Sequence, residues 1–499
     1  YSAKIPGQAG AATVQFYVEG TDGQGATSMF PAAGPDSRAL YKVEDGKNGD
    51  GPAHNFRLIM KSQDAAFLVS GTQGLTRHRI GGTVVFQDQV YYDVGIRTKA
   101  SVPHRGVYRT GFNIRFDPDH LFRGAHDIVA VDRFAMEFTG VGHREMVLKQ
   151  AMNHAGVVPT LYDEMIYFIP PDDSLTAGPA QLNMARYDDA FLDGMYANGN
   201  EGTRFKFELI YFSKTTVDGN PESPKARDIG VLPVDIWDMG DDKENYRYNY
   251  LIKNHRLRDD YSKIIDLGKT FNLNGSYNGS QLDILSQQVI DVDQWMRTFA
   301  LLTLGGMADI YHLSYWPKNL QVFVRPEDDR IIVLPWDMDG AMGHSSSADL
   351  LGAYIGSLGK TSNFRKVLEI PNNLHYYYGH INDIIETTYN LTYLNEWIDH
   401  YEPFVSVDES TFIRNYVSAR RTFALGRLPG QQSFAVTTSG NDLTVNQPAI
   451  TLEGTGWINV REIFLNDSDR PLDIVWTNTT HWQAAVPLDY GDNELTLVA

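Results

Sequence analysis

The chain has 499 residues, with 62 acidic and 43 basic side chains and a formal net charge of −19 at pH 7. Such an acidic surface disfavours nucleic-acid binding, which depends on Lys and Arg that neutralise phosphates. Cysteine is absent, which excludes disulfides, cysteine-zinc sites and cysteine nucleophiles. No run of about 18 apolar residues occurs, so no membrane span is expected. The length exceeds one compact core, which predicts two to four structural units.

The first 54 residues are predicted to form the β-rich end of an upstream module, followed by a linker. Residues 13–18 alternate in polarity as a strand does. Residues 20–51 are rich in Gly, Pro, Asp and Ala, which is typical of turns and linkers. Because residue 1 is Tyr, we expect that a signal peptide or upstream domain has been removed.

Residues 55–215 combine β-type runs with one helix. Apolar side chains recur at helical spacing over residues 143–155, and Gly156 and Pro159 follow as stop signals. The early β-type runs are separated by turn residues and predict an antiparallel meander. The expected strands of this segment are residues 83–86, 90–97, 111–116, 162–169 and 205–212.

The remaining sequence predicts a helical segment and then a β domain. Helices are expected over residues 288–304 and through residues 373–428, and residues 331–335 form a short buried strand. Beyond a boundary near Gly430, short strands separated by turns predict an Ig-like β-sandwich over residues 431–499. The expected strands there are residues 433–438, 443–446, 450–453, 462–465, 473–476, 481–487 and 494–498.

The sequence that follows residues 331–335 contains the clearest chemical motif. Trp336-Asp-Met-Asp339 places two carboxylates at the end of a strand, and glycines follow. Side chains two positions apart on extended backbone face the same way, so we expect Asp337 and Asp339 to share a hard cation such as Mg²⁺. The alternative interpretation is a turn in which aspartates cap backbone N–H groups.

Several segments, in order, resemble the CotH kinase family, named for a spore coat protein. The Trp-Asp-Met-Asp motif resembles the family's W-D-x-D, and residues 94–101 resemble its V-G-x-R-x-K-G-S stretch, with Ala100 in place of Gly. Residues 111–116 and 291–297 resemble a basic strand and the helix before the catalytic loop. The resemblance covers about residues 55–430.

The resemblance implies an α+β fold: an atypical protein-kinase-like domain with a small lobe over residues 55–215 and a large lobe over residues 216–430. It also implies an ATP-dependent phosphotransferase that uses Mg²⁺ or Mn²⁺. Its acceptors would be Ser or Thr of secreted or surface proteins, in an extracytoplasmic and bacterial setting. Two alternatives stay open: an inactive kinase-like binding or scaffold protein, and ATP-dependent transfer of another group.

The resemblance also assigns roles to individual residues. Asp309 corresponds to the catalytic aspartate, and Asn319, Asp337 and Asp339 correspond to metal ligands. The family separates the first two by about five residues, whereas ten separate them here. Either a loop is inserted or one partner is misassigned, and His312 or Lys318 could supply polar contacts instead.

Cations for the nucleotide phosphates are expected on the early strands. Arg97, Lys99 and Arg115 are the candidates, and Glu145 is the acid that would orient such a cation. For the three cations the alternative is a solvated strand face. For Glu145 it is an exposed charge favoured by the helix dipole.

Overall fold

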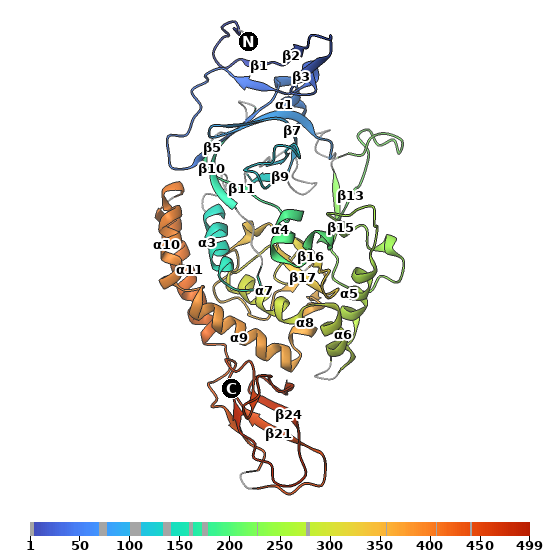
Figure 1. Cartoon of the computed structure of the whole chain (residues 1–499), viewed down its shortest axis with the longest axis vertical. Helices are drawn as coiled ribbons and strands as arrows, with labels where there is room; N and C mark the ends of the chain where they lie inside the picture. The colour runs from blue at the N-terminus through green and yellow to red at the C-terminus, as the bar shows by residue number, and fades with distance from the viewer. Residues whose placement is uncertain are drawn as a thin grey trace.

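The computed structural model describes residues 4–68, 77–99, 111–132, 141–158, 163–171, 178–226, 228–275, 280–355, 357–405, 407–439 and 442–499. Three units follow one another along the long axis (Figure 1). We name them the barrel unit (residues 54–184), the helical unit (residues 186–425) and the C-terminal β unit (residues 435–498). The mixture of helices and sheets confirms the predicted α+β class.

The N-terminal residues lie beyond the barrel unit, at one end of the molecule (Figure 1). The expected strand over residues 13–18 is divided, because its two halves pair with different partners. β1 (Thr13–Gln15) pairs with β4 (Leu40–Lys42), and β2 (Val18–Thr21) forms a hairpin with β3 (Thr27–Phe30). The segment predicted as a linker therefore contains paired strands.

The barrel unit is a closed seven-stranded barrel. Its first five strands form an antiparallel meander, which confirms the strands predicted within residues 83–116. The last two return to pair with the fifth and, in parallel, with the first. Closure leaves no exposed sheet edge. In chain order the strands are β5 (His54–Ile59), β6 (Ile80–Phe86), β7 (Gln89–Thr98), β8 (Phe112–Arg115), β9 (Ile128–Asp132), β10 (Asp163–Ile169) and β11 (Gly178–Met184).

Two helices border this barrel. α1 (Ser62–Leu68) follows β5, and α3 (Val141–Asn153) lies between β9 and β10 in sequence, which confirms the helix predicted near residues 143–155. Its apolar stripe is buried against the helical unit, where α3 contacts α10 (Leu391–Tyr401). α3 therefore links the barrel to the helices below it.

The helical unit contains a four-stranded antiparallel sheet in the order β15 (Tyr250–Ile252), β12 (Thr203–Phe207), β16 (Leu320–Val324) and β17 (Ile331–Pro335). One face packs into the largest apolar core of the described residues. The expected strand over residues 205–212 is two strands, since β13 (Ile210–Ser213) pairs with β14 (Ile229–Leu232) instead.

Helices cover the core side of this sheet and continue toward the C-terminal β unit (Figure 1). The helix expected over residues 288–304 is interrupted at Ile290, because Asp291 accepts a hydrogen bond from the Gln294 N–H and caps a new helix. The helical prediction for residues 373–428 is confirmed as three helices. The remaining helices are α4 (Asp189–Met195), α5 (Ser262–Asn272), α6 (Gln281–Val289), α7 (Val292–Leu304), α8 (Phe364–Leu368), α9 (Pro371–Thr387) and α11 (Val407–Leu425).

The C-terminal β unit has a four-stranded sheet and a separate two-stranded pair. Residues 443–446, predicted as a strand, belong to no described strand. The unit docks on α9, where the His375 ring stacks on Trp476 with centroids 3.4 Å apart. Its strands are β20 (Ala435–Val436), β21 (Ala449–Thr455), β22 (Phe464–Leu465), β23 (Ile474–Trp476), β24 (His481–Pro487) and β25 (Leu497–Val498).

His312 gives the core of the helical unit a pH-dependent stability. Its imidazole is fully buried and lies 2.7 Å from Ser362 Oγ. Burial lowers the pKa of His312 to about 3, so the ring stays neutral in the folded chain while an unfolded chain protonates it below about pH 6.5. Its contribution to stability is therefore complete above pH 6.5 and is lost as the pH falls.

We expect the free energy of unfolding to fall by about 1.4 kcal/mol per pH unit between pH 6 and pH 4 because of this histidine. Urea titrations at several pH values measure the slope. A His312→Gln variant should show a shallower slope, and His400→Gln, on an exposed part of α10, should keep that of the parent chain. Equal slopes in all three proteins would contradict the assignment.

Candidate functional site

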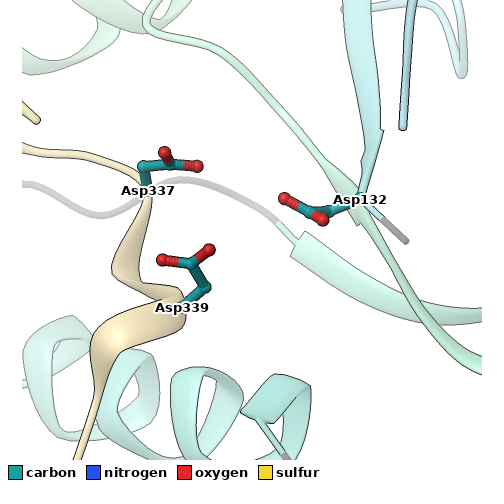
Figure 2. A group of neighbouring side chains, drawn as sticks. All are labelled: Asp132, Asp337 and Asp339. Carbon is teal, nitrogen blue, oxygen red and sulfur yellow. The ribbon is translucent and has the colours of Figure 1, made fainter. Parts of the chain in front are cut away.

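Three aspartates converge where the barrel unit meets the helical unit. Asp132 ends β9, and Asp337 and Asp339 follow β17 (Figure 2). One carboxylate oxygen from each lies within 4.8 Å of those of the other two. Asp132 is buried and the other two are half-buried. We call this group the acidic triad.

The backbone after β17 aims two members of the triad. Asp337 adopts a left-handed conformation, with φ of 60°, and Asp339 lies in the 3₁₀ turn η6 (Met338–Gly340). The prediction that the two aspartates converge on an extended backbone was therefore wrong, since the strand ends at Pro335. The turn brings the carboxylates together instead, because Met338 points into the core between them.

The same turn is joined by backbone hydrogen bonds to the segment after α7. The Ala308 N–H donates to Gly340 O at 3.0 Å, and the Met342 N–H donates to Gly305 O at 2.8 Å. Gly340 packs closely here, since a Cβ would lie 3.0 Å from the Asp309 nitrogen. Asp337 and Asp339 on this turn and Asp309 on the segment after α7 therefore lie on two loops that backbone hydrogen bonds hold together.

Lys99 places a positive charge within the triad. Its Nζ lies 3.0 Å from Asp337 Oδ1 and also forms an ion pair with Asp132. Burial disfavours the charge, but the two carboxylates outweigh burial and raise the pKa of Lys99 well above its ordinary value. Lys99, which the sequence predicted to bind nucleotide phosphates, therefore lies among the carboxylates. Its ion pairs join the barrel unit to the helical unit.

The pKa values of Asp337 and Asp339 are shifted in opposite directions. Burial opposes ionisation of Asp337, but Lys99 and Lys206 outweigh burial and lower its pKa below the usual range. Burial and the charges of Asp337 and Asp132 raise the pKa of Asp339 well above its ordinary value. A divalent cation bound between Asp337 and Asp339 would favour the ionised form of both carboxyls.

The donor set suits a hard cation. Mg²⁺ and Mn²⁺ take carboxylate oxygens as ligands, and the triad offers three of them. Like charges this close are costly unless a cation or a proton compensates them. Here the Lys99 ammonium group provides part of that compensation. The residues present therefore fit a divalent metal.

Asp309 and Asn319 lie beside the triad and contact each other. The Asn319 amide donates to the Asp309 backbone oxygen at 2.9 Å and to Asp309 Oδ2 at 3.3 Å. Lys318 pairs with Asp309 Oδ2 at 2.9 Å. Burial raises the pKa of Asp309, although Lys318 partly offsets the rise. Asp309 and Asn319 are therefore in contact, although ten residues of sequence separate them.

Arg97 and Arg115, the other two cations predicted to bind the nucleotide phosphates, lie on neighbouring strands of the barrel unit. Arg97 is half-buried on β7, and its guanidinium donates to Thr98 O at 3.2 Å. Arg115 is exposed on β8 opposite Gly95, four residues before Lys99 and so about 13 Å along the strand. The structure does not bring Arg115 to the triad.

Glu145 is buried on α3, close enough to Asp339 to raise its pKa electrostatically. Its carboxylate lies 2.9 Å from Lys149 Nζ, one helical turn along α3. Lys99 forms its ion pairs with Asp132 and Asp337, whereas Glu145 pairs with Lys149. The assignment of Glu145 as the acid that orients the phosphate cation stays a prediction.

Sequence reasoning missed Asp132, whereas it named Lys318 as a polar contact in the loop, and Lys318 does pair with Asp309. Asp132 ends an apolar strand, Ile128-Val-Ala-Val-Asp132, just as Asp337 follows one. A carboxylate directly after a buried strand was the signal used for the Trp-Asp-Met-Asp motif, and it could have been applied here. Which strand ends meet across the two units depends on barrel closure, which the sequence pattern does not reveal.

Part of the chain matches a known protein family. The model of the CotH kinase protein family matches residues 186–421. The match contains Asp309, Asn319, Asp337 and Asp339, while the barrel residues Lys99 and Asp132 precede it.

One solved structure has a low similarity to the chain. The crystal structure of a Helicobacter pylori proinflammatory kinase, CtkA, aligns with 63% of this chain and 93% of its own, at 13% identity and a TM-score of 0.30. No curated protein matches the chain. Among the described residues, no helix has the length and apolar character needed to cross a membrane.

Removing Asp132 should weaken divalent-metal binding. An Asp132→Asn variant loses one charged ligand, and Lys99 then pairs with Asp337 alone. We expect Mn²⁺ affinity, measured by isothermal titration calorimetry at neutral pH, to fall by about tenfold or more. Asp88→Asn, at an exposed turn of the same unit, is the matched control. Equal affinities would exclude Asp132 from the metal site.

Proposed function

We propose that this chain is an ATP- and divalent-metal-dependent phosphotransferase of the CotH type that modifies Ser or Thr of protein acceptors. The observation that carries the proposal is the acidic triad, whose oxygens lie within 4.8 Å of one another directly beside Asp309. The match of residues 186–421 to the model of the CotH kinase protein family supports it. Secreted or surface acceptors, and an extracytoplasmic bacterial setting, are part of the proposal.

The residues divide into two functional groups. Asp132, Asp337 and Asp339 would hold Mg²⁺ or Mn²⁺, which when bound neutralises charge on the nucleotide phosphates. Lys99 lies among these carboxylates, where it supplies a fixed positive charge for a phosphate oxygen. Asn319 positions Asp309 through two hydrogen bonds.

Asp309 is the group proposed to act on the acceptor hydroxyl. Its carboxylate would accept the hydroxyl proton while the hydroxyl oxygen forms a bond to the γ-phosphorus. The bond between that phosphorus and the β,γ-bridging oxygen breaks, and ADP leaves. The raised pKa of Asp309 makes it a better proton acceptor than an exposed aspartate.

Transfer should depend on Asp337. We expect incubation with labelled ATP and Mg²⁺ or Mn²⁺ to label the chain or a Ser/Thr-containing acceptor, and Asp337→Ala to reduce labelling at least 100-fold, because an essential metal ligand is lost. Asp349→Ala, an exposed aspartate in the segment that follows the triad, is the control. Equal labelling by Asp337→Ala would discredit the site. No labelling by the parent chain, and no rise in melting temperature with nucleotide, would favour the scaffold alternative.

Asp309→Asn should separate catalysis from binding. The amide cannot accept the hydroxyl proton, so kcat should fall by about 10²- to 10⁴-fold. The triad is intact in this variant, so nucleotide should still raise the melting temperature as it does in the parent chain. Loss of both effects would show that Asp309 supports the fold or nucleotide binding rather than the chemical step.

A further inference from the structure

One face of the sheet in the helical unit carries positive charge beside the triad. Arg204 and Lys206 alternate on β12 with Phe205 and Phe207, which face the apolar core. Lys253 follows β15 directly opposite Arg204, since its N–H donates to Arg204 O at 2.8 Å. Arg204, Lys206 and Lys253 therefore share the face that is turned away from the core.

Arg186 adds a fourth cation at the edge of this face. It follows β11 and lies 5.5 Å over the ring of Trp336, the residue before Asp337. Lys206 lies near enough to Asp337 to lower its pKa. We call Arg186, Arg204, Lys206 and Lys253 the basic cluster. It adjoins the acidic triad and extends from there toward β15, the edge strand of the sheet.

Protein groups only partly neutralise the basic cluster. Lys206 pairs with Glu208 at 2.6 Å, and one guanidinium nitrogen of Arg204 donates to Gln321. Arg204 is 94% buried, and its Nε has no hydrogen-bond partner. Within the described residues, Arg186 and Lys253 form no ion pair with a carboxylate. Asp127 and Asp188 act on Arg186 only from longer range.

This arrangement is costly in the isolated chain. Like charges directly opposite in a sheet repel, and a buried guanidinium nitrogen without an acceptor loses its hydration. Burial, followed by repulsion from Arg186, lowers the pKa of Arg204 to about 9. Burial and then the charges of Arg186, Lys206 and Arg204 lower the pKa of Lys253 well below its ordinary value. An anion bound within the basic cluster would reduce the repulsion between its charges and could accept a hydrogen bond from Arg204 Nε.

We propose that Arg186, Arg204 and Lys253, with Lys206 beside them, form a phosphate-binding subsite on the face of the β15–β12–β16–β17 sheet that is turned away from the main apolar core, beside the smaller cluster around Trp336. A guanidinium fork and an ammonium group at opposite positions of paired strands suit the several oxygens of a phosphate. In a chain of net charge −19, such a concentration of cations next to the carboxylates is a local exception. The purpose of the subsite rests on the proposed phosphotransfer, but its binding test does not.

Phosphate binding is tested without divalent metal, so that the acidic triad cannot contribute. Isothermal titration calorimetry in EDTA at low salt measures binding of inorganic tripolyphosphate to the whole chain. We expect Lys253→Gln and Arg186→Gln each to weaken binding about fivefold to tenfold. Lys253→Arg, which keeps the charge, should retain most of the affinity. Lys225→Gln, which removes an exposed lysine of the same unit, should change nothing.

Absence of binding by the parent chain would overturn the subsite, as would equal affinity of Lys253→Gln, Arg186→Gln and the control. Asp337→Ala should bind tripolyphosphate in EDTA at least as tightly as the parent chain, because it removes a negative charge near the cluster. The subsite and the catalytic proposal are therefore tested separately.

Two sources of the phosphate group are distinguished by repeating the titrations with ATP and with O-phosphoserine. If Lys253→Gln weakens ATP and leaves O-phosphoserine unchanged, the subsite holds nucleotide phosphate. If it weakens O-phosphoserine and leaves ATP unchanged, the subsite holds a phosphate that the acceptor already carries. If neither ligand responds to the substitution, the subsite assignment fails.

Discussion

The ion pairs of Lys99 are the interaction on which the candidate site depends. The ammonium group comes from the end of β7 and contacts Asp132 of the barrel unit and Asp337 of the helical unit. Without a compensating cation, three carboxylates this close and this buried would repel one another strongly. Lys99 thus makes the triad tolerable in the free chain, and it also fixes how the barrel sits over the sheet.

Local sequence patterns predicted the elements well where one periodicity dominated. The apolar stripe of α3, the strands of the meander and the buried strand β17 were all visible in the sequence. Predictions failed where a single residue ended an element. Asp291 begins a new helix by capping it, and the strand expected over residues 205–212 divides because β13 turns to pair with β14. These outcomes depend on tertiary partners that periodicity does not reveal.

The site was predictable only in part, and for a related reason. The Trp-Asp-Met-Asp motif and Asp309 lie in one matched segment, so the sequence brought them to attention together. Asp132 lies about two hundred positions earlier, and only closure of the barrel brings it to the motif. The basic cluster was also missed, because Arg204 and Lys253 are ordinary strand residues until the register places them opposite each other.

The backbone hydrogen bonds between the turn at Gly340 and the segment at Gly305–Ala308 have a mechanical consequence. They make Asp309, Asp337 and Asp339 parts of one connected pair of loops, whereas Asp132 and Lys99 belong to the barrel unit. A shift of the barrel unit relative to the sheet would move Asp132 away from Asp337 and Asp339 without breaking these backbone hydrogen bonds. A divalent cation bound by all three aspartates would oppose that shift and would so stabilise the contact between the two units.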